Sequence, residues 1–231
     1  MKKVRTVVGM NTGHNGGCAL CVDGKIVRAI TEERLTRKKG ASGWLNALTY
    51  CLESTDTQLK DIDLFVFSSY RNRLPKGYDG GLGRLGVSRD KCTNVDHHLS
   101  HACSAFFSSP YEKSLVAVYD GHGNDNDTES FYLGEGTLLT KIGGSPTPNP
   151  MRGIVRAYEA FTTYFGWESS EAGKTMGLAS YGDPNHFSGH PIYTQDRDGF
   201  FRNVFDDFYA YGLERFCRRH NIKVPPKFER N

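Results

Sequence analysis

A chain of 231 residues, 38% hydrophobic and 24% charged, is long enough for one large domain or for two lobes around a substantial core. Its 29 basic and 26 acidic residues leave a net charge of only +3, which argues against a protein that coats nucleic acid. No apolar stretch approaches the roughly 20 residues that a transmembrane helix needs, so no membrane partner is expected.

The first residues, MKKVRTVVGMNTGHNGG, begin like a signal peptide, but Arg5 interrupts the apolar stretch and glycines soon follow. We therefore interpret them as a first β-strand. Six cysteines are scattered along the chain and, without a signal peptide, they indicate a reduced, cytoplasmic protein. Cys18 and Cys21 form a lone CxxC, but residues three apart in a strand point to opposite faces, so we expect a structural role for them.

The opening of the chain predicts three strands joined by glycine turns. The stretches VRTVVGMN, CALCVDG and KIVRAITEER, with GHNGG at the first turn and DG at the second, are typical of an antiparallel meander. GWLNALTYCLES then predicts a helix with Trp44, Leu45, Leu48 and Leu52 on one face. The charge run TEERLTRKK by itself indicates a solvated surface.

The middle of the chain predicts a strand, a loop and a helix. DIDLFVFSS is typical of a buried strand. Residues 71–91, rich in glycine and basic side chains, predict a mobile loop of the kind that orders on a ligand. NVDHHLSHACSAFF predicts a helix, since Asp96 or Asn94 can cap it and Ala102, Ala105 and Phe106 supply a packing face.

The pattern of the opening is repeated after Pro110, as the strands SLVAVYDGHGN, ESFYLGEG and LLTKIGGS. Two such meanders predict a duplicated architecture. A proline-rich connector, residues 145–153, leads to a predicted helix, IVRAYEAFTTYFGW, and then to ESSEAGKTMGLASYGDP, a stretch dense in glycine around one lysine. The remaining residues predict a short hairpin and an aromatic, basic helix.

Three histidines fall within five positions at the start of the histidine-rich helix. His97 and His101 are four residues apart, so their side chains project from one face, whereas His98 is rotated away. Two imidazoles placed in this way form half of a Zn or Fe site, which needs a further ligand and an open position for substrate. The alternative is a polar helix start whose histidines bond to solvent or backbone.

The stretch VAVYDGHGND combines a strand with a polar glycine turn. The strand delivers Asp120 and His122 into the turn, where Gly121 and Gly123 allow the backbone to approach an anion such as phosphate. A plain hairpin turn would give the same local sequence.

Two further glycine-rich stretches are candidates for nucleotide binding. The first turn holds Gly13, His14 and Asn15, and it is neither a GxGxxG motif nor a Walker motif. EAGKTMGLASYG places Lys174 after Gly173 but lacks the earlier glycine of a P-loop. Lys174 can reach a phosphate as a point charge, or it can be a solvated loop lysine.

Taken in chain order, these motifs resemble the O-carbamoyltransferases of the nodulation-factor and antibiotic-biosynthesis type, in their N-terminal Kae1-like domain. The matching stretches are GHNGG (13–17), EERLTRKK (32–39), DHHLSHA (96–102), DGHG (120–123) and EAGKTMGLASYGDP (171–184). The resemblance implies an α/β fold of the ASKHA type, like actin and sugar kinases, with duplicated lobes of mixed β-sheets flanked by helices. The lobes would span residues 1–113 and 114–231, the second being incomplete.

The resemblance also implies a reaction. In the family, carbamoyl phosphate and ATP give carbamoyl-adenylate in a YrdC-like domain, and the Kae1-like domain moves the carbamoyl group to a hydroxyl of the substrate. By position, His97 and His101 are the expected ligands of Fe²⁺ or Zn²⁺. The remaining matched residues are expected to be catalytic (His14, Asp120 and His122) or to contact the carbamoyl group or nucleotide (Gly13, Asn15, Gly121, Gly123, Gly173 and Lys174).

The chain departs from the family in length, since family members are more than twice as long. The late aspartate that is their third metal ligand has no match, and neither has the YrdC-like domain, so we expect a fragment, a remnant or a split enzyme with a second chain as partner. The acceptor is expected to be a small molecule with a hydroxyl, and no nucleic acid. The alternatives are a catalytically silent nucleotide-binding module and a tRNA threonylcarbamoyl-transfer subunit.

Overall fold

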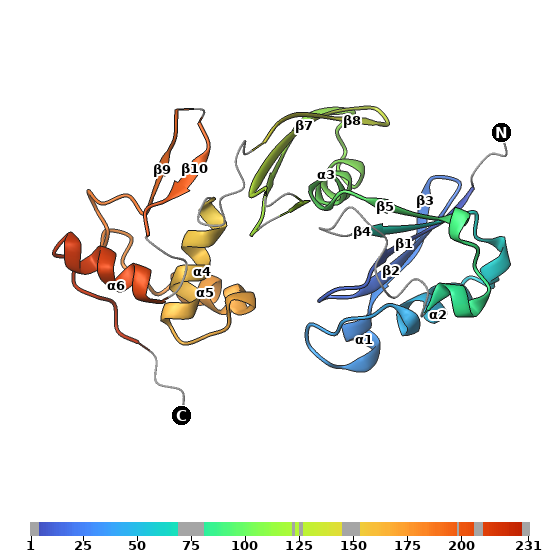
Figure 1. The fold of residues 1–231 in the computed structure, drawn as a ribbon, viewed down its shortest axis with the longest axis horizontal. Helices are drawn as coiled ribbons and strands as arrows, with labels where there is room; N and C mark the ends of the chain where they lie inside the picture. The colour runs from blue at the N-terminus through green and yellow to red at the C-terminus, as the bar shows by residue number, and fades with distance from the viewer. Residues whose placement is uncertain are drawn as a thin grey trace. The chain divides into compact units, whose positions relative to one another are not determined.

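The structure is a computed structural model, and it describes residues 5–68, 81–121, 123–124, 127–144, 153–197, 199–205 and 210–227. The chain divides into two compact units, Met1–His101 and Ala102–Asn231 (Figure 1). The division falls inside a helix, and the predicted lobe boundary at residue 113 stays a prediction. Each unit is described by itself.

The first unit contains a five-stranded mixed sheet in the order β3-β2-β1-β4-β5. Its strands are β1 (Thr6–Asn11), β2 (Gly17–Val22), β3 (Lys25–Thr31), β4 (Leu64–Ser68) and β5 (Cys92–Val95). The first three strands form the predicted antiparallel meander, whereas β4 runs parallel to β1 and β5 runs parallel to β4. The buried strand β4 was predicted, and β5 was not.

Helices α1 (Glu32–Thr36) and α2 (Leu45–Glu53) follow the meander. The prediction for this region needs two corrections. Strand β3 ends at Thr31, so the residues EER begin a helix instead of extending the strand. In α2 the buried side chains are Ala47, Leu48 and Cys51, while Leu45 is 54% exposed, because the helix packs its Ala47 face against β2.

The loop predicted over residues 71–91 is partly outside the described residues. From residue 81 the chain forms two single turns of 3-10 helix, η2 (Leu82–Leu85) and η3 (Arg89–Lys91), in addition to the earlier η1 (Leu59–Asp61). Leu82 is fully buried in the core of the first unit, so residues 81–91 are not an irregular loop throughout. That the segment is mobile and orders on a ligand stays a prediction.

The predicted histidine-rich helix is α3 (His97–Phe107). Its cap is Asp96, whose Oδ1 accepts the Leu99 N–H at 2.9 Å, and the carbonyl of Asp96 accepts the Ser100 N–H at 2.9 Å. Of the two caps considered, Asp96 is therefore the one used, because it satisfies an N–H that has no partner inside the helix.

The second unit repeats the antiparallel meander in β6 (Lys113–Tyr119), β7 (Glu129–Glu135) and β8 (Leu138–Gly144). Val116, Val118 and Tyr132 are buried on the face where Phe106 of α3 packs against Gly134. The two meanders confirm the predicted duplication. Within the described part of the chain no strand pairs with the outer edge of β6, and the predicted incompleteness of this lobe stays a prediction.

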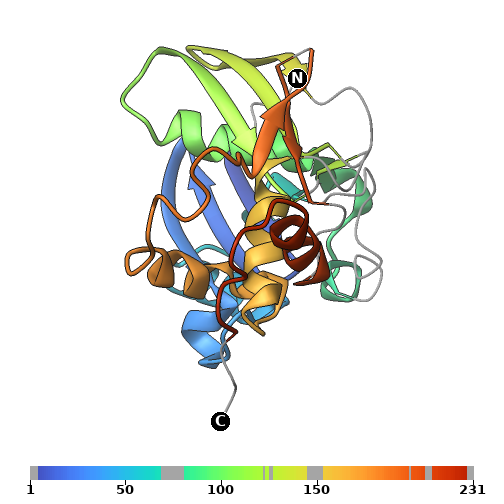
Figure 2. The ribbon, with the colours of Figure 1, turned by 90° about the vertical axis from the view of Figure 1, so that its left-hand side faces the viewer.

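The rest of the second unit is a helical cluster with a short hairpin. It comprises α4 (Ile154–Tyr164), η5 (Ser169–Glu171), α5 (Ala172–Ala179), β9 (Tyr193–Gln195), β10 (Phe201–Asn203) and α6 (Ala210–Arg219). Helices α4 and α6 lie side by side and enclose a core that includes Ala160, Tyr164, Leu213 and Phe216 (Figures 1 and 2). Residues 172–179 of the glycine-rich stretch are helical, although no helix was predicted there.

The observed architecture is α/β, with mixed and antiparallel sheets flanked by helices, which confirms the predicted fold class. None of the described helices has the length and apolar character needed to cross a membrane.

Candidate functional site

The first glycine turn is organised by the side chain of Asn11, at the end of β1. Its Nδ2 donates to the carbonyl oxygens of His14 at 3.1 Å and Asn15 at 3.2 Å, and its Oδ1 accepts the Gly13 N–H at 3.1 Å. Asn15 has the left-handed conformation, φ 53°, that asparagine tolerates. The exposed side chains of His14 and Asn15 are thus presented on a backbone that is already fixed.

The same turn packs against the loop that follows α1. The Gly16 N–H donates to the carbonyl of Ala41 at 2.8 Å, and the Gly43 N–H donates to the carbonyl of Thr12 at 3.3 Å. A Cβ on Gly16 would lie 2.1 Å from the Gly43 carbonyl oxygen, so only glycine fits here. The backbone around Ala41 and Gly43 is therefore hydrogen-bonded to the turn at Thr12 and at Gly16.

Glu32 is a structural determinant of this region that the charge-run interpretation missed. Its side chain is 2% exposed, which corrects the expectation of a solvated surface for TEERLTRKK at this residue. Oε1 accepts the Ala47 N–H and Oε2 accepts Asn46 Nδ2, both at 2.8 Å, while the Glu32 N–H donates to the Gly16 carbonyl at 2.8 Å. Glu32 therefore joins the first turn to the start of α2, where a carboxylate is favoured by the free N–H groups.

The predicted metal pair lies on one face of α3. The Nε2 atoms of His97 and His101 are 3.2 Å apart, and the ring planes are inclined at 88°. Two nitrogens at this separation fit neighbouring positions around one ion bound at about 2.1 Å, since the angle at the ion would be about 100°. His98 is 1% exposed and belongs to the interior, as expected for a residue that supports the helix start.

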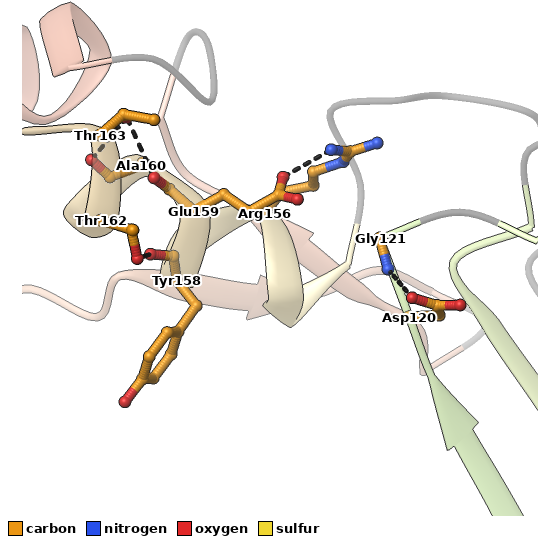
Figure 3. A network of polar contacts seen from close by, with 8 residues as sticks. All are labelled: Asp120, Gly121, Arg156, Tyr158, Glu159, Ala160, Thr162 and Thr163. Carbon is orange, nitrogen blue, oxygen red and sulfur yellow. Dashed lines mark hydrogen bonds and ion pairs between the residues drawn. The ribbon is translucent and has the colours of Figure 1, made fainter. Parts of the chain in front are cut away.

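The second glycine turn joins β6 to β7. The Asp120 N–H donates to the Thr128 carbonyl at 3.0 Å, and the Gly121 N–H donates to Asp120 Oδ1 at 2.6 Å (Figure 3). Gly123 is buried, and its N–H donates to the carbonyl of Asp127 at 2.6 Å. The predicted catalytic residue His122 lies outside the described residues. The carboxylate of Asp120 is held close to its own turn.

Helix α4 places an ion pair beside this turn. Nη1 of Arg156 lies 2.5 Å from Oε2 of Glu159, and the two side chains are only 10% and 17% exposed. Oε1 of Glu159 lies 3.4 Å from the position of a Cβ on Gly121 (Figure 3). Neither residue carries a motif, so sequence reasoning could not find them; a charged pair three residues apart on an amphipathic helix is ordinarily solvent-exposed.

Glu129 is a buried carboxyl group at the start of β7, 1% exposed. Burial raises its pKa, the charge of Asp196 raises it further, and hydrogen bonds from the Phe201 N–H oppose the rise. This side chain links β7 to β10 within the second unit.

Lys174 lies in α5 and not in a glycine loop, which corrects the predicted setting. Its Nζ is 2.5 Å from Oε1 of Glu171 and 5.8 Å from the centre of the Trp167 ring. Lys174 and the neighbouring Gly173 are exposed, so a phosphate can approach them. Their predicted role in nucleotide binding stays a prediction, as do the roles of the other motif residues.

The candidate residues come from both units of the chain. The first turn with His14, and the pair His97 and His101, belong to the first unit, and the Asp120–Gly123 turn and Lys174 belong to the second.

Comparison with known proteins identifies one family. The sequence profile described as "Carbamoyltransferase N-terminus" matches residues 6–80 and 81–221. The uncharacterized protein sll1178 of Synechocystis sp. is 33% identical over 75% of this chain and 34% of its own length, and the nodulation protein NolNO of Sinorhizobium fredii is 30% identical over 74% and 28%. The chain therefore spans about a third of the length of these curated relatives.

Similarity to solved structures is weak. The activator of 2-hydroxyisocaproyl-CoA dehydratase from Clostridium difficile, a structure with bound ADPNP, matches 78% of this chain and 67% of its own with 16% identity and a TM-score of 0.37. A similarity of this size supports no statement about ligands or activity.

Proposed function

This chain belongs to the carbamoyltransferase N-terminal family, and we propose that it carries the transfer site of an O-carbamoyltransferase. The observation that carries the proposal is the pair His97 and His101, whose Nε2 atoms lie 3.2 Å apart on α3. The reaction would move a carbamoyl group from carbamoyl-adenylate to the hydroxyl of a small-molecule acceptor.

In the proposed step the acceptor oxygen bonds to the carbamoyl carbon, the bond from that carbon to the adenylate oxygen breaks, and AMP leaves. The hydroxyl proton passes to a base, for which Asp120 or His122 is proposed. His97 and His101 would hold Fe²⁺ or Zn²⁺, which supplies Lewis-acid polarisation of the carbamoyl oxygen. The chemistry of the donor set fits, because imidazole nitrogens suit both ions.

The two glycine turns are proposed to position the anionic parts of the donor. The first turn would place His14 and Asn15 against the carbamoyl or phosphate group, with Asn11 and Glu32 holding its backbone. Gly121 and Gly123 would allow close approach at the second turn. Lys174, on the exposed face of α5 beside Gly173, would contact the nucleotide phosphates.

A further polypeptide is proposed to complete the enzyme. The curated relatives are about three times as long as the region that they share with this chain. We propose that a partner chain, or additional sequence, supplies a YrdC-like domain that makes carbamoyl-adenylate from carbamoyl phosphate and ATP, together with a third metal ligand.

Release of AMP from synthetic carbamoyl-adenylate tests the proposal. The metal-loaded chain is mixed with a panel of sugar, nucleoside and antibiotic-scaffold alcohols, and AMP and the carbamoylated product are measured by mass spectrometry. We expect product with wild type and none with His97→Ala plus His101→Ala, whereas Lys223→Ala, a change of an exposed lysine in the other unit, should retain activity. Equal product from the double variant would refute the proposed site.

A silent nucleotide-binding module is the second candidate, since glycine turns such as those of this chain can hold a nucleotide without catalysis. Such a module would bind ATP but would neither hold metal nor release AMP with any alcohol. Product formation in the same experiment excludes it.

A further inference from the structure

A pocket lies in the helical cluster of the second unit, and none of its lining residues belongs to a sequence motif. Its volume is about 320 Å³, in the lower part of the range of roughly 300 to 1,000 Å³ in which proteins bind small molecules. Its wall is formed by the chain just before β9, by the hairpin β9–β10 with the residue after it, and by the end of α6 (Figure 1). The lining includes His190, Pro191, Thr194, Val204, Phe216 and His220.

One side of the pocket is apolar. Phe216 of α6 is 5% exposed and packs in the core of the helical cluster, with its ring centre 5.5 Å from that of Phe205. Val204 and Pro191 add apolar surface to the lining. A small ring that lies against these side chains is removed from water together with them, which favours binding.

Two histidines provide polar groups in the same pocket. The ring centres of His190 and His220 lie 5.0 Å apart, and the His220 ring centre lies 4.6 Å from that of Phe216. Within the described part of the chain, neither imidazole has a hydrogen-bond partner. Because a neutral imidazole carries one N–H and an imidazolium carries two, the pocket wall offers at least two ring donors in any protonation state.

The charge of the lining is suited to an anion. None of the described residues that line the pocket carries a carboxylate, and Thr194 and Arg219 add a hydroxyl and a positive charge. The carboxylate of Glu214, on the same helix as Phe216, is paired with Lys227, with Oε1 and Nζ 2.5 Å apart. Donors without acidic groups beside them favour an oxyanion over a cation.

The carbonyl groups at the end of α6, which would repel an anion if they were exposed, have hydrogen-bond partners. The carbonyl of Phe216 accepts the His220 N–H at 3.1 Å. The carbonyl of Cys217 accepts the Ile222 N–H at 2.8 Å. These bonds satisfy acceptors that the last turn of a helix otherwise leaves unpaired, so the helix end is compatible with a negative ligand.

Hydrogen bonds hold two sides of the pocket in place. Nε2 of His186 donates to the Lys223 carbonyl at 2.9 Å, which joins the chain before β9 to the chain after α6. The His190 N–H donates to the Phe187 carbonyl at 2.9 Å and closes a turn beside the pocket. Because the two segments that carry the histidines are tied together before a ligand arrives, less conformational entropy is lost on binding.

We propose that this pocket binds a small organic anion, a ring compound with one carboxylate or phosphate group. His190 and His220 donate hydrogen bonds to the anionic oxygens, and the ring lies against Phe216 and Val204. The site shares no residue with the proposed carbamoyl transfer and does not rest on that function. The other explanation of the same contacts is a stack of rings that only stabilises the end of α6.

NMR spectroscopy of the full chain, followed through the histidine ring signals, tests the site with benzoate as the probe. Benzoate should shift the ring signals of His190 and His220 saturably and leave that of His186 unchanged, because His186 does not line the pocket. Benzamide has the shape of benzoate without the charge, and acetate has the charge without the ring. Each should bind at least about tenfold more weakly than benzoate, since one loses the charge-assisted hydrogen bonds and the other loses the apolar contact.

His190→Phe plus His220→Phe keeps both aromatic rings and removes their N–H donors. We expect benzoate to bind at least about tenfold more weakly to this variant, and the preference for benzoate over benzamide to disappear, while the melting temperature stays close to that of wild type. Arg218→Gln is the control, because it removes a positive charge of α6 at a residue that does not line the pocket. It should change the affinity for benzoate by less than about twofold.

The proposal is overturned if benzoate does not shift both ring signals, if benzamide or acetate binds as tightly as benzoate, or if the folded double variant keeps the wild-type affinity. The first of these results is the one that a purely structural stack of rings predicts. Phenyl phosphate distinguishes the two anions: tighter binding than benzoate assigns the site to phosphate esters, and weaker binding assigns it to carboxylates. Carbamoyl transfer is measured separately by the release of AMP, so failure of one proposal does not decide the other.

Discussion

Oε1 of Glu32 accepts the backbone N–H of Ala47 at 2.8 Å, and through this bond a residue of the predicted charged surface fixes the start of a core helix. The Glu32 N–H also holds the Gly16 carbonyl of the first turn. Glu32 thus joins the start of α2, through its carboxylate, to the turn that presents His14 and Asn15, through its backbone N–H.

Glu32→Ala should lower the free energy of unfolding by about 2 to 3 kcal/mol, because it leaves the buried Ala47 N–H and the Asn46 amide without an acceptor. Urea denaturation followed by circular dichroism measures the loss. Glu53→Ala is the control, because Glu53 is an exposed carboxylate at the end of α2. It should change the free energy of unfolding by no more than about 0.5 kcal/mol. Equal effects of the two substitutions would show that Glu32 is not a structural anchor.

Gly16→Ala should be strongly unfavourable, since the added Cβ would lie 2.1 Å from the Gly43 carbonyl oxygen and 2.7 Å from the Gly43 nitrogen. Backbone must move to relieve this contact, and we expect a loss of about 2 to 3 kcal/mol. Gly13→Ala is the matched control in the same turn, because its Cβ would meet its nearest atom, Asn11 Oδ1, at 3.6 Å. In thermal unfolding, Gly16→Ala should therefore have a clearly lower melting temperature than Gly13→Ala. Equal melting temperatures of the two variants would contradict the close packing of Gly16 against Gly43.

Glu129 predicts a specific dependence of stability on pH. Burial raises its pKa in the folded protein above the ordinary value, so the protonated form is favoured by folding. The stabilisation is fully present below the ordinary glutamate pKa and is lost as the pH rises through the raised pKa of the folded state. In urea denaturation across this pH range, the free energy of unfolding of wild type should fall as the pH rises. The fall should be smaller for Glu129→Gln, which has no carboxyl group to titrate. Glu135→Gln, which changes an exposed carboxylate, should show the same pH dependence of stability as wild type. If stability falls as steeply in Glu129→Gln as in wild type, Glu129 is not the source of the pH dependence.

Local sequence patterns were enough to predict both meanders, β4 and the histidine-rich helix, with Asp96 as one of its two candidate caps. Helix α5 was not predicted because Gly173 and Gly177 lower helix propensity. Tertiary contact overrides that preference: Thr175 is buried, and its Oγ1 lies 2.8 Å from Thr162 Oγ1 of α4. Strand β5 is a short polar strand whose pairing with β4 depends on residues far apart in sequence.

The candidate site was predictable where it depends on spacing and not where it depends on tertiary packing. The i, i+4 relation of His97 and His101 follows directly from helix geometry. Glu32, Thr128 and Arg156 are ordinary residues in the sequence, and their burial results from contacts with segments that local patterns do not identify.

Elemental analysis of the purified chain is the most direct test of the central claim that His97 and His101 bind a metal. Inductively coupled plasma mass spectrometry of wild type should find iron or zinc, either in the chain alone or once the proposed partner supplies a third ligand. His97→Ala plus His101→Ala should contain none while its circular dichroism spectrum and melting temperature stay close to those of wild type. Equal metal content in the folded double variant, or no metal in wild type under either condition, would contradict the account.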